Sequence, residues 1–346
     1  MDFNVLRMKP NGDYYRMDTV EILPFKSIVW EESYNDIGKL QAVFPRSLER
    51  ARNIQLGDWG YISGANTPMY IHSIKETDTE LWVYGYEAKA VLQKEAMRPY
   101  ATVMYPMQYI SQAIEYAWYY HVSGAYKIPS WMEDQAPSAV IPALPAQNLA
   151  ALEYWSVYDC IRQCCALVGA GYRLKFLPDL GLCQLYVWQG ADVSDKVRFA
   201  RELGNVSGLT WSTDNQSYVS QVTAIGLDGE TEVEQTYGTY GGPLDPTEAY
   251  LDLRLEFPKP DGMTRANYEA ALLTRAQMSW VSRSVKNKLD VKNVDTSRFG
   301  TAFNLGDIVG VTLPEHGLAA KARVKTLRRT IEGNRDKLTL DLSTSL

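Results

Sequence analysis

The sequence is poor in the residues from which most catalytic centres are built. Its three histidines, His72, His121 and His316, are dispersed along the chain. It contains no G-x-S-x-G elbow, no P-loop, no H-E-x-x-H helix and no C-x-x-C pair. These absences remove the usual signatures of serine hydrolases, nucleoside triphosphatases and zinc enzymes. We therefore expect no catalytic residues, no metal site and no cofactor.

Two carboxylates alone would suffice for a glycosidase, and adjacent acidic pairs occur at Glu31 with Glu32 and at Glu133 with Asp134. Neighbours on a strand point to opposite faces, so Glu31 and Glu32 cannot both line one cleft as a regular strand pair. We interpret these carboxylates as solvated or interface charges. The acidic stretch at residues 228–234 lacks the D-x-D-x-D-G spacing of a calcium loop and is interpreted as a hairpin tip.

Cysteine is also scarce. Cys160, Cys164 and Cys165 lie on one predicted helix, and Cys183 lies on a predicted strand. This spacing is unlike the disulfide framework of a secreted domain, and no second Cys/His pair lies near enough in sequence to complete a zinc site. We interpret the four residues as small, buried core side chains.

Long apolar runs and long runs of like charge are missing as well. The apolar stretch at residues 139–146 is broken by Pro142 and Pro145, far short of the roughly 20 residues that a membrane-spanning helix needs. The N-terminus lacks the basic start and apolar core of a signal peptide, so we expect synthesis and folding in the cytoplasm. A net charge of −6 argues against a general nucleic-acid binder, which needs a basic surface.

What the sequence does contain begins with a clear hairpin at residues 27–45, SIVWEESYNDIGKLQAVFP. On its second half Leu40, Ala42 and Phe44 fall on every second residue, which is the period of a half-buried strand. Residues 34–38 supply the turn, since Asn and Asp tolerate left-handed backbone angles and Gly adopts them freely.

The rest of the chain predicts a β-rich α+β fold. A length of 346 residues predicts two or three compact units, and a hydrophobic fraction of 46% is ample for packed cores. Short strands dominate to residue 96 and resume at Val197. Between them helices are predicted from Pro106 and from a Ser156 cap, followed by a hairpin of strands at residues 172–176 and 182–188. A third helix is predicted from a Thr264 cap to about Ser284. We predict a first β-barrel domain at residues 1–96 plus about 196–236, an inserted α/β lobe at 97–195, and a linker, helix and second β-barrel domain at 237–346.

The two predicted barrels share a pattern. Leu56-Gly57-Asp58 opens an apolar strand, and Leu305-Gly306-Asp307 opens another. Each is followed by a loop with Pro and Gly, a strand, a polar turn and a closing strand, at residues 69–74, 76–80 and 81–85 in the first case and 322–327, 332–337 and 338–342 in the second. A three-residue identity is shorter than a repeat assignment needs, so duplication and chance both stay open on this pattern alone.

The hairpin, with its Trp, acidic residues, aromatic, Gly and closing Pro, resembles the N-terminus of the Gp37-like tail proteins of siphophages. These belong to the wider group of baseplate hub proteins (gp27-like, Tal N-terminal). The similarity continues through Leu56-Gly57-Asp58, the strands at 69–74 and 81–85, and the helix that starts near Val157. It implies two related tail-tube-like barrel domains in each subunit, so that a trimer presents six similar barrels to a six-fold tail tube.

The resemblance also implies function and partners. It implies a structural protein of the virion, at the tail tip or baseplate, that assembles in the host cytoplasm as a homotrimer. The expected neighbours are a distal tail or tail-tube protein, the tape measure protein, and tip or fibre proteins, and DNA would pass through the channel without specific binding. A net negative charge suits such a channel.

Aromatic residues make up 12% of the chain, with 9 Trp and 23 Tyr, and interfaces favour Tyr and Trp. We therefore expect contacts to neighbouring subunits among Trp30, Glu31, Tyr34, Tyr119, Tyr120, Tyr154, Trp155, Tyr237 and Tyr240. A β-rich aromatic chain also fits a phage receptor- or glycan-binding tail protein, which would bind host cell-wall glycan saturably, and a glycan hydrolase stays a further alternative.

Overall fold

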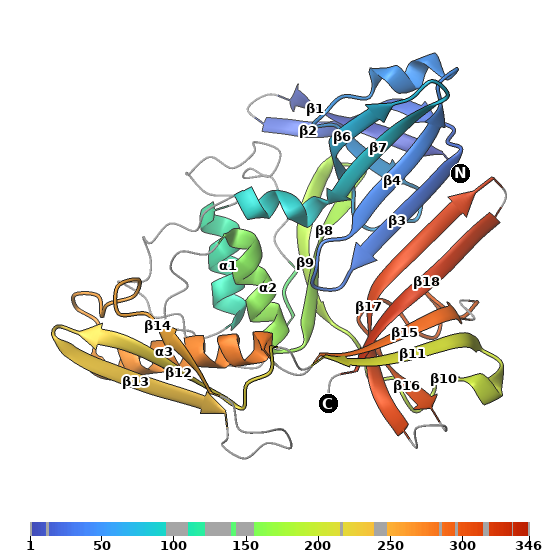
Figure 1. Cartoon of the computed structure of the whole chain (residues 1–346). Coiled ribbons are helices and arrows are strands. Elements are labelled where there is room, and N and C mark those ends of the chain that lie inside the picture. The colour runs from blue at the N-terminus through green and yellow to red at the C-terminus, as the bar shows by residue number, and fades with distance from the viewer. Residues whose placement is uncertain are drawn as a thin grey trace.

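The computed structural model describes residues 2–11, 14–94, 110–121, 140–142, 156–214, 217–238, 248–283, 286–294, 297–313, 318–333 and 335–344. It confirms a β-rich fold with few helices (Figure 1). The helices are α1 (Ile110–His121), α2 (Val157–Leu167) and α3 (Arg265–Ser282), with short 3-10 turns η1 (Glu49–Asn53), η2 (Ala88–Lys94) and η4 (Arg201–Leu203).

The strands of the N-terminal part are β1 (Phe3–Asn11), β2 (Tyr14–Leu23), β3 (Ser27–Ser33), β4 (Lys39–Pro45), β5 (Trp59–Ile62), β6 (Met69–Glu76) and β7 (Glu80–Glu87). Those that follow are β8 (Ala170–Leu177), β9 (Leu182–Gln189), β10 (Arg198–Ala200), β11 (Val206–Asp214), β12 (Gln221–Asp228), β13 (Thr231–Gly238), β14 (Glu248–Asp252), β15 (Lys286–Val294), β16 (Ile308–Leu313), β17 (Leu318–Glu332) and β18 (Arg335–Thr344).

The predicted hairpin is confirmed as β3 and β4, which pair antiparallel with Trp30 opposite Leu40. Its alternation has the expected cause, because Ile28, Trp30, Leu40 and Phe44 all enter one buried cluster. Gly38, however, does not have a positive φ. A Cβ there would lie 1.9 Å from the carbonyl oxygen of Glu31, so close backbone approach, rather than a left-handed angle, requires glycine at this position.

Two sets of five strands share one spatial order. The N-terminal β unit is β3-β4-β7-β6-β5, and the C-terminal β unit is β11-β15-β18-β17-β16. Neighbouring strands are antiparallel throughout both units. Strand β3 also pairs with β17, which joins both units, with β1, β2 and β10, into a sheet of 13 described strands. In the described residues the ladders do not close into a ring.

The Leu-Gly-Asp turns that suggested a repeat have the same geometry in both units. Gly57 has a φ of 92° and Gly306 a φ of 96°. The carboxylate of Asp58 accepts from the Gln55 N–H at 2.8 Å, and that of Asp307 accepts from the Asn304 N–H at 2.7 Å. The same pattern of backbone bonds joins the first turn to Ile71 and the second to Val324 (2.8–3.0 Å).

The α/β lobe follows the sequence closely. The Ser156 hydroxyl accepts from the Asp159 N–H at 3.1 Å and caps α2, and β8 pairs with β9 as the predicted hairpin. Their apolar faces share one core with η2 and α1. The helix expected after Thr264 is α3, and its first turn donates from the Asn267 N–H to the Thr264 hydroxyl at 3.3 Å.

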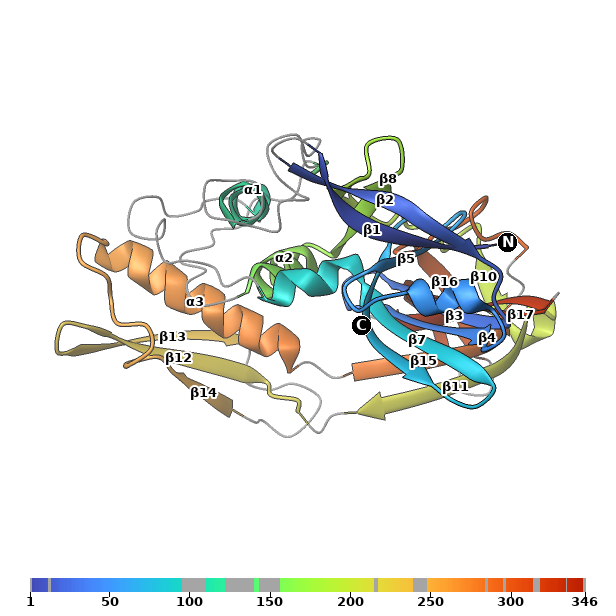
Figure 2. The same ribbon diagram turned by 90° about the horizontal axis from the view of Figure 1, so that it is seen from above.

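Strand β11 pairs with β15 of the C-terminal β unit, although residues 196–236 were predicted to join the first barrel. Alternation predicts a strand but not its partner, and here the partner lies beyond a long insertion. Strands β12, β13 and β14 form a separate sheet covered by α3 (Figure 2), which we call the α3 lobe. The division into domains stays a prediction. Among the described helices, none has the length and apolar character to span a bilayer.

Candidate functional site

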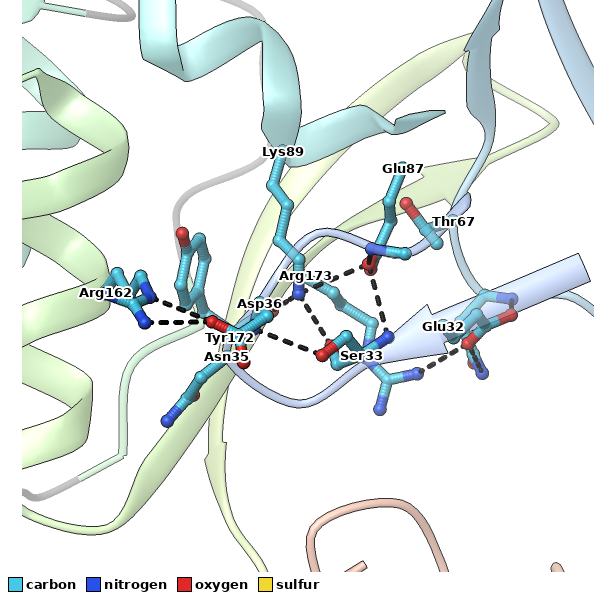
Figure 3. Close-up of polar contacts among 12 residues, drawn as sticks. Glu32, Ser33, Asn35, Asp36, Thr67, Glu87, Lys89, Arg162, Tyr172 and Arg173 are labelled. Carbon is cyan, nitrogen blue, oxygen red and sulfur yellow. Dashed lines mark hydrogen bonds and ion pairs between the residues drawn. The ribbon is translucent and has the colours of Figure 1, made fainter. Parts of the chain in front are cut away.

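The place where the two β units meet holds a cluster of buried polar side chains. Residues 27–33 of β3 lie opposite residues 326–332 of β17, with Glu31 directly opposite Arg328. Their side chains form an ion pair at 2.6 Å. Beyond this pairing the chain turns at residues 34–38, and that turn lies between the β units and the α/β lobe (Figure 3). We call this region the junction.

A buried ion pair at the end of the N-terminal β unit supports the turn. Lys89 and Glu87 are almost completely buried and lie 3.3 Å apart. The Glu87 carboxylate accepts from the N–H groups of Ser33 (3.3 Å) and Gly38 (3.0 Å). The Lys89 ammonium donates to the carbonyls of Ser33 (2.6 Å) and Tyr172 (3.2 Å). Both charges therefore bond to backbone, and the pair ties η2 to the turn and to β8.

Burial opposes ionisation of both members of this pair. It raises the pKa of Glu87 and lowers the pKa of Lys89, and the opposite charge of the partner counters each shift. A buried pair of this kind adds little net stability by itself, but removing one partner leaves a charge without compensation. The role that fits this arrangement is to fix the position of the turn.

A second pair, Glu32 with Arg173, lies close to the first. Glu32 is buried and accepts from the Asn66 N–H at 3.2 Å and from the Trp30 indole N–H at 3.3 Å. Arg173 lies 3.9 Å from the Glu32 carboxylate, and its guanidinium lies 4.0 Å from the Trp188 ring centroid. Burial lowers the pKa of Arg173. Glu31 and Glu32 thus point to different partners, as the strand geometry predicts.

Tyr34 connects all three parts of the junction and is fully buried. Its N–H donates to the Lys325 carbonyl of β17 at 2.8 Å, and its carbonyl accepts from the Tyr172 N–H of β8 at 3.1 Å. Its hydroxyl donates to the Gly169 carbonyl at 2.9 Å and accepts from the Gly190 N–H at 3.1 Å. Burial raises the pKa of this phenol, so it stays a neutral donor.

The junction is therefore a structural site. Glu87, Lys89 and Glu32 each bond to backbone groups, and Arg173 lies beside the opposite charge of Glu32. In the described residues no three His, Cys, Asp or Glu side chains converge as metal ligands. The four cysteines are free and buried, and burial raises the pKa of Cys160, Cys165 and Cys183.

The predicted contact residues divide into four groups. Trp30, Glu31 and Tyr34 come together at the junction, where Trp30 and Tyr34 are covered by this chain itself. Tyr237 lies on β13, half-buried, with its ring 5.5 Å from that of Trp280. The backbone of Tyr119 and Tyr120 belongs to α1, but their side chains lie outside the described part. Tyr154, Trp155 and Tyr240, like His316 and the pair Glu133 with Asp134, lie outside the described residues. A role in subunit contacts stays a prediction for all of them.

Sequence reasoning missed Lys89, Arg173 and Glu87 as parts of this site. Each is charged, and composition suggests exposure for such residues. The local signal was weak: Glu87 and Lys89 flank the end of a strand, and Arg173 alternates with apolar residues on β8. Their partners lie about 50 to 140 residues away in the chain, so no local pattern identifies the contacts.

Comparisons with known proteins agree on one group. A profile of the Siphovirus ReqiPepy6 Gp37-like protein family matches residues 11–342. No curated protein sequence gives a significant match. Among solved structures, a tail protein from Neisseria meningitidis MC58 aligns with 100% of this chain and 97% of its own, at 15% identity and a TM-score of 0.58.

Two further tail proteins share the fold. The 43 kDa tail protein of prophage MuSo2 from Shewanella oneidensis aligns with 100% of this chain and 98% of its own, at 12% identity and a TM-score of 0.56. The prophage tail protein gp18 from Listeria monocytogenes EGD-e aligns with 99% of this chain and 94% of its own, at 12% identity and a TM-score of 0.54. At these identities the similarity shows the fold.

Proposed function

Because the chain belongs to the Siphovirus ReqiPepy6 Gp37-like protein family, we propose that it is a structural phage tail protein, the hub of the tail tip or baseplate. Three copies form a ring that closes or extends the tail tube. The observation that carries this proposal is the pair of β units with one strand order in one chain. Three chains with two units each present six similar units, which suits a six-fold tube above and a three-fold tip below.

The mechanism of such a hub is geometric. In this proposal the two β units are the two barrel-like tube domains. The sheet of one chain does not close on itself, and it closes when the chains form the ring. The junction sets the angle between the units, since Tyr34, the Glu87–Lys89 pair and the β3–β17 pairing all act at the same place. A fixed angle is what a closed ring of defined size requires.

The proposed partners follow from this position. The ring stacks on a distal tail or tail-tube protein, surrounds the channel through which the tape measure protein and then DNA leave, and carries tip or fibre proteins. A net charge of −6 suits a channel that releases DNA without binding it. The role is structural and not enzymatic, in the virion, after assembly in the host cytoplasm.

The mass of the purified protein in solution, measured by light scattering at several concentrations, tests the proposal. A hub gives the mass of a trimer. A chain that stays monomeric and binds host cell-wall glycan saturably contradicts the proposal and favours a receptor- or glycan-binding tail protein.

A further inference from the structure

The contact between the two β units inside one chain is an edge-to-edge strand pairing. Strand β17 divides at a bulge around Lys325, where its register shifts relative to β18. Before the bulge it pairs with β16 of its own unit, and after the bulge residues 326–332 pair with β3 of the other unit. The second half of β17 is thus the strand edge with which the N-terminal β unit pairs.

The N-terminal β unit has the same edge. Its strand β6 pairs with β5 at Met69 and Tyr70, and its register relative to β7 shifts at the equivalent place, around His72. After the bulge residues 73–76 pair with β7, and in the described part of the chain no strand pairs with their other side. Ser73 and Ile74 are half-buried, whereas Lys75 and Glu76 are exposed. This edge corresponds to residues 326–329 of β17.

The C-terminal β unit in turn has an equivalent of β3. In the first unit Trp30 lies opposite Leu40 and Val29 opposite Gln41. In the second unit Trp211 of β11 lies opposite Leu289, and Thr210 opposite Asp290. The next ladder agrees with this equivalence. Leu40 lies opposite Gly85 of β7, and Leu289 lies opposite Leu342 at the equivalent place on β18.

Strand β11 therefore occupies the place of β3, with Trp211 as the counterpart of Trp30. Among the described strands β11 pairs with β15 alone, so its outer edge corresponds to the edge by which β3 joins β17. Each chain thus has an edge on β6 that is equivalent to the β17 edge, and an edge on β11 that is equivalent to the β3 edge.

From this repeat we propose that subunits join by strand addition, with β11 of one copy pairing antiparallel with residues 73–76 of β6 in the next. The inference rests on the proposed function, in that the second copy is a subunit of the same ring. Transferring the β3–β17 register places Ile74 opposite Thr213 of the neighbouring copy, Lys75 opposite Ser212 and Ser73 opposite Asp214.

The physical argument is that an unpaired strand edge is a template for another strand. Both edges already exist in the folded chain, so pairing them requires no refolding. Because different edges meet, the contact is head-to-tail, and such contacts generate a ring when the rotation closes. If the contact between chains repeats the contact within a chain, each step around the ring turns by the same angle, as a ring of like units needs.

Cysteine cross-linking tests the register. Partners directly opposite on antiparallel strands have Cα atoms about 4.5 to 5.5 Å apart, within the range of a disulfide. The variant I74C/T213C should therefore form linked dimers and trimers on mild oxidation, seen on a denaturing gel without reductant. The native cysteines are buried, and wild type treated identically measures their contribution.

The matched control is I74C/S212C, which shares one cysteine but lies one residue out of register, so that the two side chains point to opposite faces. It should link no more than either single variant. A second in-register pair, K75C/S212C, repeats the test if circular dichroism shows that the first pair is not folded.

Light scattering of the unoxidised variants separates this inference from the proposed function. A trimer that links selectively in register supports both. A trimer in which the in-register and control variants link equally, or not at all, overturns the strand pairing and leaves the hub intact. A chain that stays monomeric and unlinked at every concentration contradicts both.

Discussion

At the residue scale, Tyr34 shows how tightly the junction is built. A Cβ added to Gly171 or to Gly306 would lie 2.2 Å from atoms of the Tyr34 ring, so both backbones approach that ring more closely than any other residue allows. The ring also meets Trp188 edge-on at 5.1 Å. One side chain from the β3–β4 turn thus fills the space between β8 and the Leu-Gly-Asp turn that begins β16.

The two repeated glycines permit a controlled test of that packing. Gly57 and Gly306 have nearly the same positive φ, but a Cβ on Gly57 would meet nothing within 4 Å. Gly57→Ala should lose about 1–2 kcal/mol of unfolding free energy, the cost of a left-handed non-glycine residue. Gly306→Ala should lose roughly 1–3 kcal/mol more, the usual cost of overpacking. Equal losses in urea denaturation would show that Tyr34 does not constrain this turn.

Asp192 provides a pH-dependent contact between the segment after β9 and β17. Lys321 donates to its carboxylate at 2.7 Å, and that bond together with Ser194 lowers the Asp192 pKa to about 2. A carboxylate whose pKa is lowered by folding stabilises the fold above its unfolded pKa of about 3.9, and that contribution is lost as the pH falls toward 2.

Asp192→Asn should therefore be less stable than wild type in urea at pH 5 to 7, and the difference should shrink steadily from pH 4 to pH 2. Asp195→Asn, at a neighbouring exposed carboxylate, is the control and should show a smaller difference at neutral pH. A deficit in Asp192→Asn that is the same at pH 6 and pH 2 would rule out the ion pair as its cause.

Sequence reasoning at this scale recovered the local chemistry but not the burial. The Ser156 cap, and the opposite directions of Glu31 and Glu32, follow from spacing alone. Tyr34 is a predicted contact residue because tyrosine is common at interfaces, and its side chain is fully buried within the chain. Its partners at Gly169, Gly190 and Lys325 lie 135 to 291 residues away, and no local pattern contains that information.

At the scale of elements, the contact between β3 and β17 depends on backbone pairing supported by the ion pair between half-buried Glu31 and exposed Arg328. Reversing a charge in either Glu31→Arg or Arg328→Glu puts like charges directly opposite, which should cost about 0.5–1 kcal/mol of unfolding free energy. The double variant E31R/R328E restores opposite charges and should recover most of that loss. If the double variant loses the sum of the two single losses, the side chains do not interact across the strands.

The elements themselves were largely predictable, because turn chemistry and alternation are local. The Leu-Gly-Asp pattern left duplication open, and the structure shows the same glycine angle and aspartate cap at both turns. Strand partners were not predictable. Strand β11 pairs with β15, which follows the whole α3 lobe in the sequence, and β17 pairs with β3 nearly 300 residues away. Such pairings depend on topology and not on the residues between them.

At the scale of the whole molecule, the α3 lobe is an insertion in the β11–β15 hairpin. Asp214 lies opposite Lys286, so the hairpin is already closed where the lobe begins. The lobe also has its own core, which includes Val222, Phe257 and Tyr268. Among the described side chains of α3, Met278 alone belongs to the core of the α/β lobe.

Replacing residues 215–285 by Asn-Gly, the preferred two-residue hairpin turn, should therefore leave both β units folded. The unfolding free energy should fall by no more than about 2–5 kcal/mol, the usual cost of losing one buried Met side chain. Circular dichroism and urea denaturation check this, and a variant that is unfolded or aggregated would show that the lobe is part of the β unit and not an insertion.

The ring itself is the central claim, and electron microscopy of the purified protein tests it most directly. Views along the axis should show a closed ring with an open centre, three copies of the chain, and six similar densities around the channel from the two β units of each copy. Monomers at every concentration, open filaments, or a ring whose chains contribute one density each to the channel wall would contradict the account.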